Sequence, residues 1–114
     1  HLLCARLRPG SVDASAGATD ELARIVAQLR TAWPDVRIVV RADSGFCRDA
    51  LLTWCEAHAV DYVIGLARNT RLVAAIGGAL RRAHRTCVAT EAPDREVVDF
   101  TYRTRRGWTR VRRV

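Results

Sequence analysis

The residue best placed to do chemistry in this sequence is an acid, Asp43, that directly follows a short apolar run. The run Val36–Ala42 ends at Asp43-Ser44-Gly45, where a helix can begin. An acid at the carboxyl end of a buried strand faces solvent yet is held rigidly, as a Mg²⁺ ligand should be. The same position suits an acid that caps the following helix, so the residues alone leave both roles open.

The other aspartates near this segment have weaker claims to a site. Asp61 lies at the start of the next strand, and so at the opposite edge of the sheet. Asp13 and Asp20 fall in a loop and in the first turn of a helix, and Asp49 is an acid at a helix start, favoured by the helix dipole. We therefore take Asp43 as the single candidate metal ligand and catalytic residue.

Two cysteine–histidine pairs have a spacing that could bind zinc. They are Cys55-x-x-His58 and His84-x-x-Cys87. Structural zinc pairs usually sit on tight turns, whereas both of these fall in predicted helices with apolar neighbours. We expect a buried cysteine and a surface histidine in each pair, and no zinc.

The positive charge is concentrated near the C-terminus. The formal net charge is +7, and all 19 basic residues are arginine. Residues 1–101 hold 13 arginines against all 12 acids, so they are nearly neutral. The stretch from Tyr102 onward has no acid and six arginines: Arg103, Arg105, Arg106, Arg110, Arg112 and Arg113. Such a stretch suits a phosphate-rich partner, but a solvated edge hairpin would have the same composition.

Apolar spacing predicts an α/β order for the first part of the chain. The expected strands cover 2–8, 36–42 and 60–66. A helix from 15 or 19 to 33 follows the first strand, and a helix over 48–59 joins the other two. A further helix is capped by Asn69, and Gly77-Gly78 weakens its middle. The run over 36–42 is almost continuously apolar, which is typical of a central strand buried on both faces. It should pair in parallel with 60–66.

The last part of the chain changes character. Val98, Phe100 and Tyr102 alternate as in a two-faced strand, Arg106-Gly107 can turn, and Trp108–Val114 can return. The predicted organisation is an α/β core over 1–86 followed by a basic β-hairpin segment over 87–114. No apolar run is long enough for a membrane span, so we expect no membrane partner. The chain starts without Met and stops within an apparent strand, which predicts a piece of a larger protein.

Several segments together resemble one family. They are Arg41-Ala-Asp-Ser-Gly-Phe46, Trp54-Cys-Glu-Ala57, Val60-Asp-Tyr62 and Gly65-Leu-Ala-Arg-Asn69. The sequence is similar to bacterial insertion-sequence transposases of the DDE type, the group known as transposase DDE domain group one. The resemblance implies a partial ribonuclease-H-like mixed sheet with flanking helices over 1–86, followed by the start of a β-rich insertion over 87–114.

The resemblance also implies a reaction. In this family three acids hold two Mg²⁺ or Mn²⁺ ions, which assist phosphodiester hydrolysis and strand transfer in DNA transposition. Asp43 matches the second acid. The first and third would lie outside this chain, so we expect the parent protein to be an enzyme and these residues alone to be inactive. The implied partners are transposon-end and target DNA, with a possible homo-oligomer of the full-length protein, in the cytoplasm at the nucleoid.

DNA contacts are expected at two places. In the hairpin segment arginines suit phosphates and aromatic rings suit unpaired bases; the candidates are Arg103, Arg105, Arg106, Trp108, Arg110 and Arg112. Arg41 and Arg68 flank the expected catalytic edge and could meet phosphate or equally be solvated. For Trp108 the favoured alternative is simple packing on the hairpin. The alternatives are a non-catalytic DNA-binding module, whose site would be the hairpin, and a decayed transposon remnant.

Overall fold

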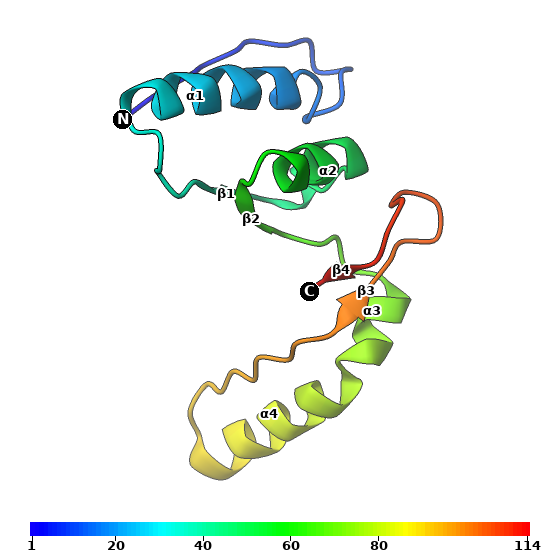
Figure 1. The fold of residues 1–114 in the computed structure, drawn as a ribbon. Coiled ribbons are helices and arrows are strands. Elements are labelled where there is room, and N and C mark those ends of the chain that lie inside the picture. Colours follow the sequence, from blue (N-terminus) through cyan, green and yellow to red (C-terminus); the bar gives the residue numbers. More distant parts are fainter. The chain divides into compact units, whose positions relative to one another are not determined.

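The computed structural model describes every residue from His1 to Val114 and divides the chain into two compact units, residues 1–66 and 67–114. The chain is a mixed α/β protein with four α-helices and two small sheets (Figure 1). None of the helices combines the length and apolar character needed to cross a membrane.

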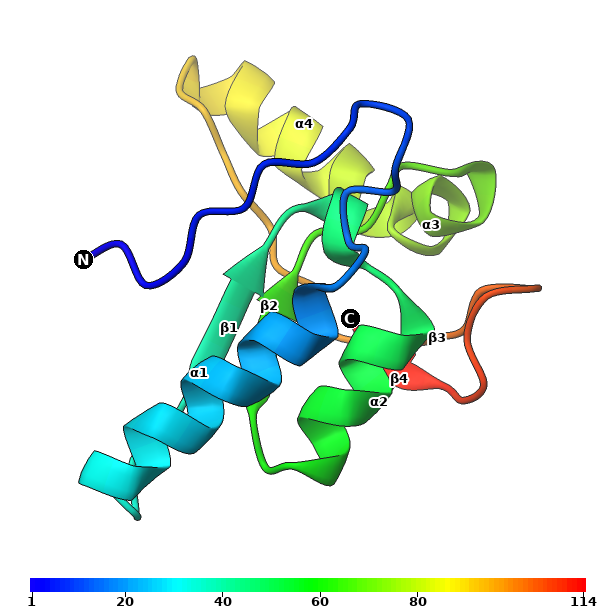
Figure 2. The ribbon, with the colours of Figure 1, turned by 90° about the horizontal axis from the view of Figure 1, so that it is seen from above.

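The first unit is built around two parallel strands. In chain order it contains α1 (Ala18–Ala32), β1 (Val39–Ala42), a 3₁₀ turn η1 (Ser44–Phe46), α2 (Asp49–Ala57) and β2 (Asp61–Ile64). β1 pairs with β2 in parallel, with Val39 opposite Asp61 and Ala42 opposite Ile64. The predicted parallel pair, joined by a crossover helix, is therefore confirmed. Figure 2 shows α1 and α2 on the same side of the strands.

The core of the first unit lies between the two helices and the pair of strands. Val26 of α1, Leu51 and Cys55 of α2, and Val60 are buried, and partly buried side chains of both strands pack against them. The opposite face of the strands is open, since Val39 is 48% and Val63 61% exposed. The prediction that 36–42 is buried on both faces is therefore wrong, because the helices cover a single face.

The predicted strand over Leu2–Arg8 is also wrong, since this segment forms no strand. Its apolar side chains are exposed, and Leu7 is fully so. Its arginines are held by side-chain contacts instead: Arg6 lies 3.8 Å from Glu21, and Arg8 donates to the carbonyl of Ala16. A strand exists only where a neighbour accepts its backbone hydrogen bonds, and apolar composition alone does not supply one.

The second unit consists of two consecutive helices and a hairpin. These are α3 (Thr70–Ala75), α4 (Gly77–Thr90), β3 (Thr101–Tyr102) and β4 (Arg112–Arg113). Asn69 caps α3 as predicted, because its Oδ1 accepts from the Leu72 N–H at 3.0 Å. The helix is interrupted at Ile76, directly before Gly77-Gly78, as the glycine pair predicts. α4 then continues past residue 86 to Thr90.

The predicted basic hairpin is present. β3 and β4 are antiparallel, with Tyr102 opposite Arg112. Phe100 and Val114 extend the pairing, since each donates its N–H to the other's carbonyl, at 3.1 and 2.9 Å.

Candidate functional site

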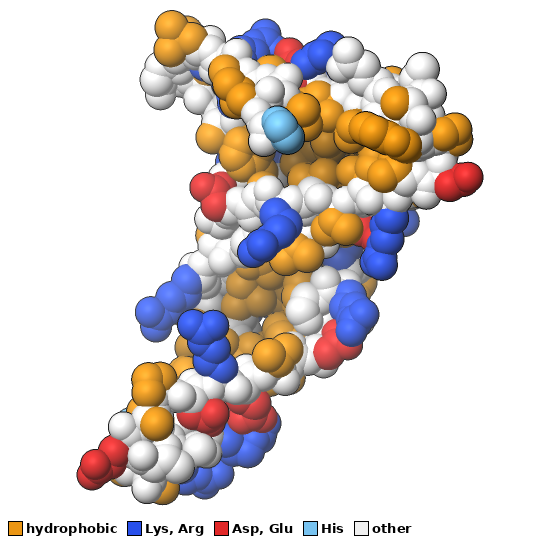
Figure 3. All heavy atoms as spheres, turned by 90° about the vertical axis from the view of Figure 1, so that its left-hand side faces the viewer, with side chains coloured by type: hydrophobic (Ala, Val, Ile, Leu, Met, Phe, Trp, Pro, Cys, Tyr) orange, Lys and Arg blue, Asp and Glu red, His pale blue; other side chains and the backbone are white.

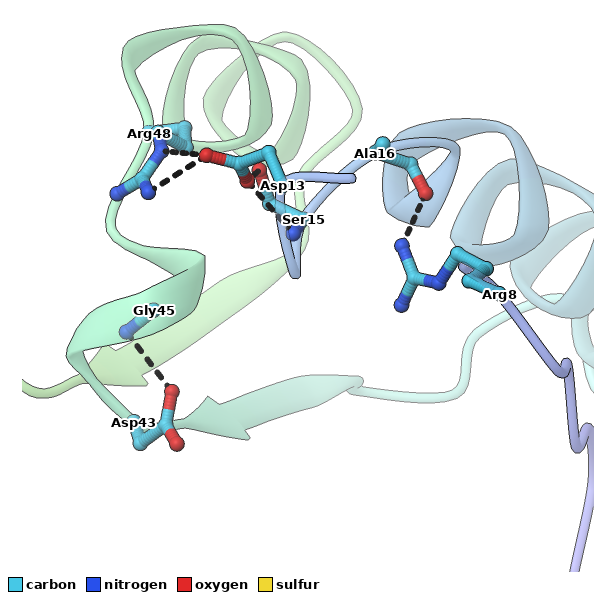
Figure 4. A network of polar contacts seen from close by, with 7 residues as sticks. All are labelled: Arg8, Asp13, Ser15, Ala16, Asp43, Gly45 and Arg48. Atoms are coloured by element: carbon cyan, nitrogen blue, oxygen red, sulfur yellow. Dashed lines mark hydrogen bonds and ion pairs between the residues drawn. The ribbon is translucent and has the colours of Figure 1, made fainter. Parts of the chain in front are cut away.

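Asp43 stands at the carboxyl end of β1, as predicted, and its side chain is exposed. Its backbone is extended, and its Oδ1 accepts from the Gly45 N–H at 2.8 Å, which starts the η1 turn (Figure 4). The capping role is therefore real, although the capped element is η1 rather than α2. The structure assigns no hydrogen bond to Oδ2, so one carboxylate oxygen remains available to a ligand.

An open hollow adjoins Asp43 at the carboxyl edge of the two strands. Its volume is about 620 Å³, and its lining residues are Arg41, Ala42, Asp43, Val63, Ile64 and Gly65. In open α/β sheets this edge is where ligands bind. The hollow therefore places the candidate metal ligand beside Arg41, which was predicted to meet phosphate.

Gly65 shapes this edge, and its role could not be assigned from the sequence. Its N–H donates to the Ala42 carbonyl at 3.0 Å, so it continues the parallel pairing of β1 with β2. A Cβ at Gly65 would lie 3.2 Å from the Ser44 nitrogen and 3.5 Å from the carbonyl carbon of Asp43. Only a glycine lets the Asp43–Ser44 corner lie this close to the end of β2 without a shift. The signal in the sequence was a glycine directly after the strand.

A second polar contact fixes the turn that follows Asp43. Arg48, which precedes α2, donates from Nη2 to Asp13 Oδ2 at 2.8 Å, and the Ser15 hydroxyl donates to Asp13 Oδ1 at 2.6 Å (Figure 4). The hydrogen bond from Ser15, and next that from Arg48, hold the pKa of Asp13 well below its ordinary value. Asp13 thus ties the loop before α1 to the start of α2.

The structure brings no further metal-ligand side chains together around Asp43 to form a cluster of three. No group of three or more His, Cys, Asp or Glu side chains is close enough to hold a metal ion. Cys55 is fully buried, and burial raises the pKa of its thiol; His58 is exposed and stacks on Trp54 with 4.3 Å between ring centroids. Mg²⁺ sites often use one or two carboxylates, with water and phosphate completing the shell. Asp43 therefore suits one ligand position but does not make a complete site.

The hairpin of the second unit is organised around Tyr102. The Trp108 ring meets it edge-on at 6.0 Å, the Arg71 guanidinium of α3 lies 5.1 Å from its centroid, and its hydroxyl donates to Asn69 Oδ1 at 3.3 Å. Arg112 in turn lies 5.2 Å over Trp108. Cation–π and edge-to-face contacts of this kind fix side chains in place. The hairpin is therefore anchored on α3.

This packing divides the residues that were predicted to contact DNA. Trp108 and Arg112 are buried, with 8% and 5% of their surface exposed. In this structure the Trp108 ring and the Arg112 guanidinium therefore pack within the hairpin itself. Four others are exposed: Arg103, Arg105, Arg106 and Arg110. Arg68 is exposed in the second unit and Arg41 lines the hollow of the first. DNA contact by any of the eight stays a prediction.

Charge differs sharply between the units. Residues 1–66 hold 7 arginines and 8 acids, whereas residues 67–114 hold 12 arginines and 4 acids. In the lower part of Figure 3, where the second unit is drawn, blue arginine side chains gather beside a few red acids. A net charge of +8 on one unit favours a polyanionic partner there.

Comparison with known proteins gives one match. The family model described as transposase DDE domain group 1 matches residues 1–114, which is the whole chain. No curated protein and no solved structure matches.

Gly65→Ala should displace the corner that carries Asp43. The new methyl group would press on the Ser44 nitrogen, so we expect a stability loss of about 1–3 kcal/mol and changed amide chemical shifts at Ser44 and Gly45. Gly10→Ala is the matched control, because nothing lies within 4 Å of a Cβ there. Urea denaturation and NMR spectra of the two variants test this, and equal effects would contradict it.

Asp13 should remain ionised at pH values where free aspartate takes up a proton. Its folded pKa is depressed, so the associated stability is present above the unfolded pKa of about 3.9 and is lost as pH falls toward the folded value. We expect carboxyl ¹³C shifts to show a low pKa that rises in Ser15→Ala and in Arg48→Gln. An ordinary pKa for Asp13 in the unsubstituted chain would refute the Ser15 and Arg48 contacts.

Proposed function

The chain belongs to the transposase DDE domain group 1 family, and from this premise we propose that residues 1–86 form part of a ribonuclease-H-like catalytic core in which Asp43 is one metal ligand. Residues 87–114 would begin a basic β-rich insertion. Members of this family act in DNA transposition, so the parent enzyme would perform phosphodiester hydrolysis and strand transfer on DNA.

The observation that carries this proposal is the place of Asp43. It presents a carboxylate oxygen at the carboxyl edge of a parallel strand pair, in an open hollow that also contains Arg41. Arg41 would bind a DNA phosphate, and Gly65 keeps the corner in position. Asp43 would hold one of the Mg²⁺ or Mn²⁺ ions, which when bound would supply activation of the attacking hydroxyl and stabilisation of the leaving oxygen. Because a single carboxylate cannot hold two ions, we expect no strand transfer by this chain alone.

Most of the proposed DNA contacts lie in the second unit. Its net charge of +8 supports phosphate contacts by the exposed arginines of the hairpin, Arg103, Arg105, Arg106 and Arg110, with Arg68 before α3. Trp108 and Arg112 would reach DNA only if the stack on Tyr102 opened. The same charge favours a second candidate function, a DNA-binding module without catalysis. The two candidate functions differ in whether Asp43 is needed as a metal ligand.

Asp43→Asn should abolish metal binding while leaving the fold intact, because an asparagine oxygen can still cap the Gly45 N–H. We expect Mn²⁺ to broaden the NMR signals of Ser44, Gly45 and Gly65 in the unsubstituted chain and not in this variant. Asp20→Asn, a change of another exposed carboxylate, should leave the broadening unchanged.

Two results would count against this assignment. Equal broadening in Asp43→Asn would leave Asp43 as a cap only. Metal-dependent DNA cleavage by the unsubstituted chain, lost in Asp43→Asn, would disprove the expected inactivity of the chain alone.

Arg105→Ala combined with Arg106→Ala should weaken binding to duplex DNA. Each lost phosphate contact lowers the slope of log K against log salt by about 0.9, so the slope should fall by about 2. Fluorescence anisotropy with a labelled duplex over a salt series measures this. Arg24→Ala combined with Arg37→Ala removes the same charge from the first unit, where both arginines are paired with acids, and should change binding little. Equal losses in the two double variants would show a net-charge effect only.

A further inference from the structure

α4 carries a set of arginines that lies outside the hairpin and has no assigned role. Between Gly77 and Thr90 the helix has three arginines and no acid. Arg81 and Arg85 are exposed and four residues apart, so they lie on one face of the helix. These two residues are termed the α4 arginine face.

Arg82 is different from its two neighbours, because an acid already neutralises it. Its Nε donates to Glu96 Oε1 at 2.8 Å and its Nη2 contacts the same oxygen. This pair fastens the segment after α4 to the helix. Arg81 and Arg85 have no acidic partner in the structure. Like charges at this spacing repel and destabilise a helix slightly. An anion bound from outside would reduce the repulsion between Arg81 and Arg85.

The surroundings of the face leave space for a nucleic-acid backbone. The Arg81 guanidinium lies over Gly77, since a Cβ there would be 3.5 Å from Nη1. Gly78 lies under the Arg82 guanidinium in the same way, and Val88, three residues after Arg85, is exposed. Arg81 and Arg85 are separated by about 6 Å along the helix axis, so their side chains can reach neighbouring phosphates of one DNA strand.

We propose that Arg81 and Arg85 form a second phosphate-contact surface for duplex DNA, additional to the hairpin. This inference rests on the proposed DNA-binding function and extends it to a helix that the sequence analysis left unassigned.

The test is DNA binding by Arg81→Ala combined with Arg85→Ala in the 114-residue chain. The probe is a labelled 20-base-pair duplex, followed by anisotropy from low to moderate salt. We expect affinity to fall on the order of ten- to fiftyfold at 0.1 M salt and the salt slope to fall by about 2, as for two lost phosphate contacts. Arg81→Lys combined with Arg85→Lys should restore most of the binding, because a lysine still contacts phosphate as a point charge.

The controls separate this inference from the proposed function. Circular dichroism of the double alanine variant must show that α4 is retained, and the lysine variant supplies a second comparison if it is not. Unchanged binding in the alanine variant, with a loss in Arg105→Ala/Arg106→Ala, would overturn the α4 arginine face and leave the hairpin proposal standing. Absence of duplex binding by the unsubstituted chain would overturn both. An equal loss of DNA affinity in Arg24→Ala/Arg37→Ala would show that net charge alone explains the effect, and it would overturn the inference.

Discussion

The parallel pairing of β1 with β2 is the constraint on which the first unit depends. Two parallel strands cannot be joined by a tight turn, so the chain must cross over through α2, and this crossover buries Leu51 and Cys55 against Val26. The same pairing brings the carboxyl ends of both strands to one edge. Asp43 and Gly65, 22 positions apart in the sequence, become neighbours there only because the strands run in the same direction.

The elements that follow from the spacing of apolar residues could be predicted from the sequence. The features that depend on a neighbouring segment of the chain could not. The helices, the parallel strands, the Asn69 cap and the hairpin each follow from local spacing or local chemistry. Leu2–Arg8 did not form a strand, because no neighbour bonds its backbone, and the second face of β1 is open because no helix covers it. The roles of Gly65 and Asp13 were equally hidden. Each is defined by a residue more than twenty positions away.

In the hairpin, composition alone could not separate the residues that pack from those that stay exposed. Arginine and tryptophan suit DNA contact and internal packing equally well. Which role a residue takes depends on whether it lies close to Tyr102. The Trp108 ring meets the Tyr102 ring edge-on, Arg112 lies over Trp108, and both are buried. Arg105 and Arg106 lie in the connection between β3 and β4 and are exposed. The difference between the two groups is thus one of position on the hairpin, which composition does not encode.

Charge is distributed unequally between the two units, since the first is nearly neutral and the second is strongly positive. A carboxylate that binds a divalent ion repels the DNA phosphate on which it would act until the ion is present. The first unit, with 7 arginines and 8 acids, cannot overcome that repulsion through its own field, and Arg41 is the one cation that lines the hollow beside Asp43. The second unit carries an excess of eight positive charges, which favours a polyanionic partner independently of a metal. In the proposed function, loss of the Asp43 charge would remove a metal ligand while DNA binding by the second unit remained, because the metal ligand and most of the proposed DNA contacts lie in different units of the chain.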